Sequence, residues 1–136
     1  MIKNYYYLTA GILAILFSIS HAWNGQNMVL QTLNVYASPT DTKTMFLYVW
    51  HIISAENMVF GVAFILMSVH KDLSKVNFTA WIIVFLMIVR WIVILGSTIF
   101  YNVNDFNATW KESIAFMVFI SIIILGIRKK DIKVDI

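Results

Sequence analysis

The chain contains no cysteine, a single proline and only 12% charged residues. The missing cysteine excludes disulfide bonds, thiolate metal sites, a CxxC redox pair and a cysteine nucleophile. With 60% hydrophobic residues over 136 positions and a mean hydropathy of +0.79, the chain is too apolar for a soluble domain of this size. This composition is typical of the membrane class.

The basic residues lie at the ends of apolar segments and form no patch, so we expect no nucleic-acid partner. Apart from Arg90, they fall into two unequal groups on the two sides of the predicted membrane. The larger group is Lys3, Lys71, Lys75, Arg128, Lys129, Lys130 and Lys133, and the smaller is Lys43 and Lys111. The positive-inside rule therefore predicts a multi-pass plasma or inner membrane protein with both termini in the cytoplasm.

Four apolar segments are long enough to cross the hydrocarbon core, which takes about 20 helical residues. The sequence predicts an all-α integral membrane protein, an antiparallel four-helix transmembrane bundle that forms one domain over residues 1–136. We expect its spans at 5–23, 45–69, 78–101 and 112–127. The bilayer is then its first partner, and so short a chain is expected to form a homo-oligomer or to join a larger membrane complex.

Residues 24–44 are expected to form an outer loop that caps the mouth of the bundle. Because this connection is long for a helix hairpin, we expect it to contain a short helix lying on the membrane surface. At its end, Ser38-Pro39-Thr40-Asp41 predicts a helix start, with serine as N-cap and proline at the first helical position. The second span is thus expected to begin outside the bilayer.

The first apolar segment also has features of a signal peptide. Lys3 precedes a short apolar run, and Ser20-His21-Ala22 offers small residues for cleavage after Ala22. The three tyrosines at 5–7 instead favour a retained helix with an interfacial anchor. We expect retention, and cleavage stays the alternative.

Two helix faces carry small or polar residues at spacings of three and four. They comprise Gly11, Ala14, Ser18 and His21 in the first span, and Trp50, Ser54, Asn57 and Gly61 in the second. Residues at these spacings lie on one side of a helix. The first set is rich in small residues, which predicts close packing against another helix.

Glu56 in the second span and Arg90 in the third are costly inside a bilayer unless they are paired. With a helical rise of about 1.5 Å per residue, Glu56 lies roughly 21 Å and Arg90 roughly 20 Å above the inner boundary. The sequence therefore predicts an ion pair between them. The pair either only fixes helix register, or it places Arg90 as an anchor for an anion or carbonyl beside an acid or base, Glu56.

Further polar and aromatic residues are expected near this pair, in the outer half of the bundle. The catalytic candidates are Glu56 and His51, although about 140° of helical rotation between them keeps both from facing one axis. The proposed ligand-binding residues are Arg90, Glu56, Asn57, His51, His21, Trp50, Trp91 and Tyr101. The alternative for each histidine is an interfacial imidazole that bonds backbone or water.

We expect no cofactor or metal, because the chain lacks HxxxH, HExxH and CxxCH motifs. The alternatives are a haem held by His21 and His51, or a divalent ion held by these residues and Glu112.

The leading functional hypothesis is an outward-opening intramembrane pocket that binds a small or lipid-like molecule, with acid/base chemistry left open. The alternative is an accessory, immunity-type or structural membrane subunit whose Glu56–Arg90 pair serves helix packing alone.

Overall fold

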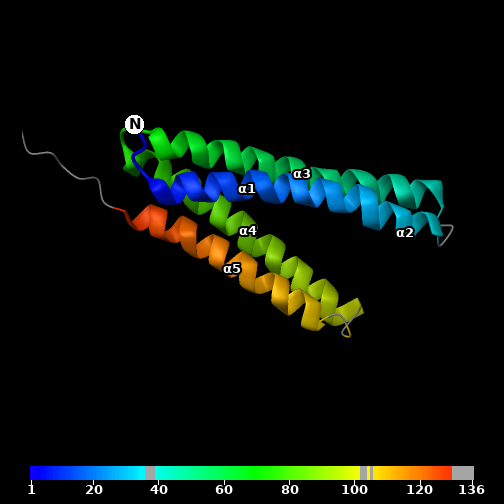
Figure 1. Ribbon diagram of the computed structural model, residues 1–136. Coiled ribbons are helices and arrows are strands. Elements are labelled where there is room, and N and C mark those ends of the chain that lie inside the picture. Colours follow the sequence, from blue (N-terminus) through cyan, green and yellow to red (C-terminus); the bar gives the residue numbers. More distant parts are fainter. Residues whose placement is uncertain (36–38, 102–103, 105, 130–136) are drawn as a thin grey trace, which may run out of the picture.

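The computed structural model describes residues 1–35, 39–101, 104 and 106–129, and these contain helices and no strand. The elements are α1 (Tyr5–Asn24), a π-helical turn η1 (Gly25–Val29), α2 (Leu30–Val35), α3 (Thr40–Val69), α4 (Leu73–Tyr101) and α5 (Phe106–Arg128). The long helices alternate in direction along the chain (Figure 1). The predicted all-α, four-helix architecture is confirmed.

Four helical stretches are long and apolar enough to cross a membrane. They are Tyr5–Val35, Thr40–Val69, Leu73–Tyr101 and Thr109–Arg128, and each contains one predicted span. Large apolar side chains such as Leu66, Phe85 and Val118 lie exposed on the outer surface of the bundle. Such an extensive exposed apolar surface is favourable in contact with lipid and unfavourable in contact with water. The chain is a multi-pass membrane protein.

Residues 24–44 differ from the capping loop that we expected. The first helix continues through η1 into α2, and α3 already begins at Thr40, so the two helices run on beside each other (Figure 1). Gly25 permits this, because a Cβ atom there would lie 2.3 Å from ring atoms of Trp50. No proline interrupts the helix before Pro39, which is the N-cap of α3 and not its first helical residue. Ser38 lies outside the described residues.

Helices α1 and α3 pack closely along the two faces that the sequence analysis identified. Gly11, Ala14 and Ser18 are buried. A Cβ atom at either Gly11 or Gly61 would lie 2.9 Å from the carbonyl oxygen of the other residue. The Ser18 hydroxyl donates a 2.7 Å hydrogen bond to the backbone oxygen of Ser54. The expected close packing of the first span is confirmed, and the first helix is part of the bundle.

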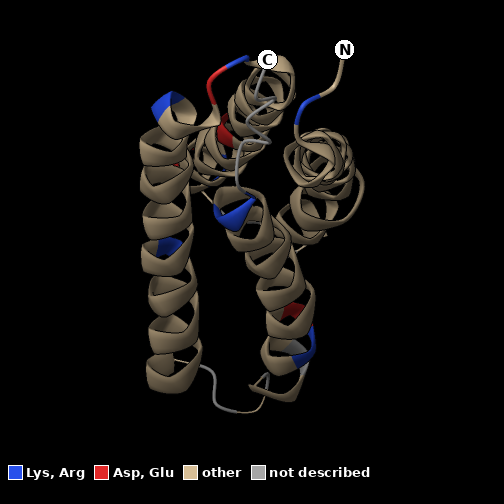
Figure 2. Ribbon diagram, turned by 90° about the vertical axis from the view of Figure 1, so that its left-hand side faces the viewer, with Lys and Arg blue, Asp and Glu red and all other residues tan. Residues whose placement is uncertain are grey.

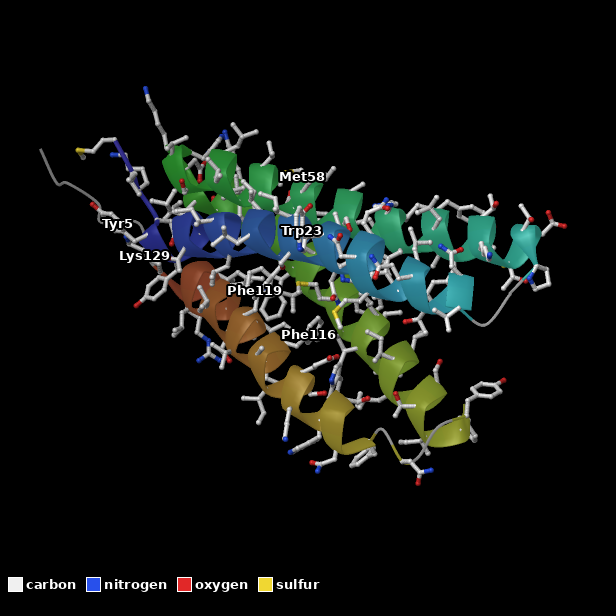
Figure 3. All side chains as sticks on the ribbon, turned by 45° about the vertical axis from the view of Figure 1, so that its right-hand side comes forward. Tyr5, Trp23, Met58, Phe116, Phe119 and Lys129 are labelled. Atoms are coloured by element: carbon white, nitrogen blue, oxygen red, sulfur yellow. The ribbon has the colours of Figure 1, made fainter. Side chains whose placement is uncertain are left out.

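One end of the bundle, here called the basic end, carries the N-terminus, the turn between α3 and α4, and the last turn of α5. Figure 2 shows most of the basic residues gathered there. Lys129 Nζ lies 5.6 Å from the ring centroid of Tyr5, and both residues appear at this end in Figure 3. From the basic end the α1–α3 pair and the α4–α5 pair diverge toward the opposite, open end (Figure 1).

A buried hydrogen-bond network joins the helices at the basic end. Asn4 caps α1, since its Oδ1 accepts from the backbone N–H groups of Tyr6 and Tyr7. Its Nδ2 donates to the backbone oxygen of Gly126 at 2.8 Å, and the Tyr7 hydroxyl donates to Asn77 Oδ1 at 2.7 Å. Asn4 and Tyr7 are completely buried. These bonds hold α1, α4 and α5 together where the two helix pairs meet.

We expect Asn4→Ala to lower the free energy of unfolding by about 2 kcal/mol, because it removes a helix cap and an interhelical bond of about 1 kcal/mol each. Unfolding in mixed detergent micelles measures this loss. Asn27→Ala is the matched control, since the exposed Asn27 side chain donates to the Trp23 backbone oxygen one turn earlier and bonds no other helix among the described residues. We expect a change below about 0.5 kcal/mol for the control. Equal losses in both variants would contradict the role of the network.

Candidate functional site

A cavity of about 490 Å³ lies between the two helix pairs, and all four long helices contribute to its walls. On each helix, an aromatic or methionine side chain lines the cavity nearer the basic end than the polar residues do, and Ile53 and Ile94 line it beyond the polar residues, toward the open end. The apolar group, here called the floor, is Phe17, Phe60, Met87, Phe116 and Phe119. The polar group, here called the polar layer, is His21, Asn24, Asn57, Arg90 and Glu112. From the basic end toward the open end, the cavity wall thus consists of the floor, then the polar layer, then Ile53 and Ile94.

The floor forms the part of the cavity wall nearest the basic end. The rings of Phe17 and Phe119 meet edge to face with their centroids 5.7 Å apart. Figure 3 shows Phe116 and Phe119 on the side of α5 that faces the α1–α3 pair. Such a contact between aromatic rings is favourable in this orientation. An apolar group that enters the cavity would therefore rest on a floor of aromatic rings.

Arg90 reaches from α4 across the cavity to two consecutive residues of α3. Its Nη1 donates to Asn57 Oδ1 at 3.0 Å, and its Nη2 donates to Glu56 Oε2. The Arg90 side chain is 20% exposed and the Glu56 side chain 49% exposed. Arg90 and Asn57 line the cavity, whereas Glu56 lies outside its lining. The guanidinium is thus compensated by a carboxylate that itself stays out of the cavity.

His21 is held by Trp50, and one of its ring nitrogens is buried. The two rings are parallel within 1°, with centroids 4.3 Å apart. Trp50 Nε1 donates a 2.7 Å hydrogen bond to the backbone oxygen of His21. His21 Nε2 is buried and has no hydrogen-bond partner in the described part of the chain. His21 lines the cavity with other atoms, since Nε2 itself has almost no accessible surface.

His51 lies on the other side of α3 from Glu56, as the helical spacing predicted. Gln26 Nε2 donates to His51 Nε2 at 2.9 Å. His51 and Trp50 border a small separate space with Gly25 of η1. The two catalytic candidates therefore do not converge, because one side chain faces the α1–η1 helix and the other faces α4.

Trp91 and Tyr101 also lie outside the cavity lining. Trp91 Nε1 donates to Ser113 Oγ at 2.9 Å and joins α4 to α5, beside a separate groove on that helix pair. Helical rotation of about 100° turns Trp91 away from the neighbouring Arg90. Tyr101 is 90% exposed at the end of α4, where the helix pairs have diverged. Of the expected ligand-binding residues, the structure brings His21, Asn57 and Arg90 into one cavity.

The residues named as alternative metal ligands do not form a site together. Among the described residues, no three histidine or acidic side chains are placed to hold a metal ion. His21 and Glu112 line the cavity, but His51 does not. His51 Nε2, the nitrogen that would also serve as an axial haem ligand, accepts a hydrogen bond from Gln26.

Sequence reasoning missed Asn24 and the aromatic floor, and it considered Glu112 only as a metal ligand. A signal for Asn24 exists in the sequence, because Phe17, His21 and Asn24 follow one another at spacings of four and three. That spacing places them on one helix face. The signal went unused because the first span was expected to end at residue 23, one residue too early.

Comparison of the chain with protein-family models, with curated proteins and with solved structures gives no match.

Proposed function

We propose that the cavity binds a small amphiphilic or lipid-like molecule that enters from the outer leaflet. The observation that supports this most is the direction of polarity along the cavity, from the aromatic floor to the polar layer. Its volume of about 490 Å³ lies within the range of about 300–1,000 Å³ typical of ligand sites. The mostly apolar wall with a few convergent polar groups is also typical of such sites.

The orientation of the bundle agrees with a ligand from the outer leaflet. The excess of lysine and arginine at the basic end favours a cytoplasmic location for that end and, with it, the predicted cytoplasmic termini. The polar layer then lies toward the outer surface of a plasma or inner membrane. A lipid of the outer leaflet has its polar group outward and its apolar chain toward the midplane. In the cavity, the polar layer likewise lies outward, and the floor lies toward the midplane.

The polar layer supplies three kinds of hydrogen-bonding group to the head of the ligand. Arg90 retains N–H groups that neither Asn57 nor Glu56 uses, because a guanidinium carries five of them. Asn24 offers a side-chain amide and Glu112 a carboxylate. Glu56, outside the lining and held by Arg90, positions this guanidinium and is not placed to exchange a proton with the ligand. Binding is therefore the function that the geometry supports best.

We expect the native protein, extracted in a mild nonionic detergent, to carry a bound amphiphile that native mass spectrometry detects. Ala115→Trp fills the cavity and should abolish this adduct, because Ala115 lines the wall. Ala55→Trp is the matched control: the same substitution at an exposed position of α3 outside the cavity should leave the adduct in place. Protein without an adduct in the wild type, or equal adducts in both variants, would overturn the proposal.

A second candidate is an accessory or immunity-type subunit that docks on a partner through its spans. The observation that favours it is that Arg90 binds two consecutive residues of α3 where α3 and α4 otherwise make few contacts. In that case the charges serve helix register alone, and the partner is a larger membrane complex or a second copy of the chain.

A further inference from the structure

The charges that line the cavity are unequal, and this bears on the class of ligand. The positive charge of Arg90 is compensated by Glu56. The carboxylate of Glu112 lines the cavity from α5, and no hydrogen bond or ion pair engages it among the residues that the structure describes. The polar layer therefore holds one uncompensated negative charge. Such a charge in a partly apolar wall is stabilised by an opposite charge within about 4–6 Å.

We infer, on the basis of the proposed function, that the ligand is an amphiphilic amine whose ammonium group is bound by Glu112. Glu112 lines the cavity from α5, and its carboxylate accepts a charge-assisted hydrogen bond from the ammonium group. Because no described residue engages this carboxylate, binding breaks no existing bond.

The neighbourhood of Glu112 also suits a cation with an apolar body. Phe116 lies four residues after Glu112 on α5, which places its ring one turn below the carboxylate on the same helix face. Aromatic ring faces attract an ammonium group at about 6 Å or less. The rest of the floor then contacts the apolar chain. An anionic head group would instead be repelled by the Glu112 carboxylate. Arg90 would offset this repulsion only weakly, because Glu56 already compensates its charge.

Three amphiphiles with the same dodecyl tail and different head-group charges show whether the cavity binds an amphiphile at all and which head-group charge it prefers. The full chain in nonionic detergent is offered an equimolar mixture of dodecylamine, N-dodecylacetamide and dodecanoate, and native mass spectrometry gives their relative occupancies. We expect the amine to bind about 10- to 100-fold more tightly than the neutral amide, as charge-assisted bonds of this kind provide. We expect dodecanoate to bind most weakly.

Glu112→Gln should reduce the affinity for the amine to that of the amide and leave the affinity for the amide unchanged. Unchanged binding of the amide also shows that the variant is folded, and Glu112→Asp, which keeps the charge, should keep the preference. Asp41→Asn is the matched control, since it removes one exposed carboxylate near the open end and outside the cavity.

Three results distinguish a failure of this inference from a failure of the proposed function. Equal binding of amine and amide, or tightest binding of dodecanoate, overturns the inference but does not contradict the proposed ligand-binding function. An amine preference that survives in Glu112→Gln also overturns it. Absence of binding for every probe overturns the proposed function together with the inference.

Discussion

Exchanging the two charges, in the double variant Glu56→Arg/Arg90→Glu, should restore the stability of the bundle without restoring ligand binding. The single variant Arg90→Met leaves Glu56 without its partner in a predominantly apolar region. We expect it to lower the free energy of unfolding by about 2 kcal/mol. This value is at the low end of the cost of an unpaired charge inside a membrane, because Glu56 is half exposed. The double variant returns an ion pair between α3 and α4, so this loss should be largely recovered.

Ligand binding should behave differently, because the exchange moves the guanidinium to a residue outside the cavity lining. The position of Arg90 in the polar layer would then hold a carboxylate. Unfolding in mixed micelles and native mass spectrometry of the adduct measure the two properties on the same preparations. Lys43→Met is the control for loss of a cation, since Lys43 lies in the first turn of α3 and outside the cavity. Recovery of the adduct in the double variant would contradict the role of the Arg90 guanidinium in binding the head of the ligand.

Gly61→Leu should separate α1 from α3 and have the largest effect on stability of any substitution considered. A Cβ atom at Gly61 would lie 2.6 Å from the Ile15 side chain and 2.9 Å from the backbone oxygen of Gly11. A side chain can rotate away from such an overlap, but the backbone of α1 cannot. We expect a loss of about 3 kcal/mol or more in the free energy of unfolding, as for severe overpacking at a close helix contact.

Gly96→Leu provides the matched control for this substitution. No atom lies within 4 Å of a Cβ atom built at Gly96, so a leucine there meets open space. Replacing glycine in a helix by a better helix former should leave stability unchanged or raise it by about 0.5–1 kcal/mol. Gly61→Leu should also weaken ligand binding, because Asn57 lies one turn away on α3 and moves with it. Equal stabilities of the two variants would contradict the close contact of α1 and α3.

The helical spans and one packing face were predictable from short stretches of sequence. The length and apolarity of the four segments depend only on local composition, and the structure contains them all. The spacing of Gly11, Ala14 and Ser18 places them on one helix face whatever the neighbouring helix is. The equal depths of Glu56 and Arg90 follow in the same way from a constant rise per residue.

The cavity could not be predicted in this way, because its residues come from different helices whose rotation and tilt depend on packing. Periodicity places Arg90 and Trp91 about 100° apart, but it does not say which of them faces α3. The bonds of Asn4 and Tyr7 at the basic end join residues up to 122 positions apart. Such contacts determine where the helix pairs meet and where they diverge.

The sequence by itself determined that this is a four-helix membrane protein with two opposite charges at one depth, because segment length, composition and helical rise are local properties. Only the tertiary structure decided that the helix continues beyond α1 through η1 into α2, since that depends on Gly25 meeting Trp50, 25 residues later in the chain. It also decided that His21, Asn57, Arg90 and Glu112 share one cavity while His51, Trp91 and Tyr101 do not. The physical reason is that a side chain's direction in a bundle is set by the packing of whole helices against one another.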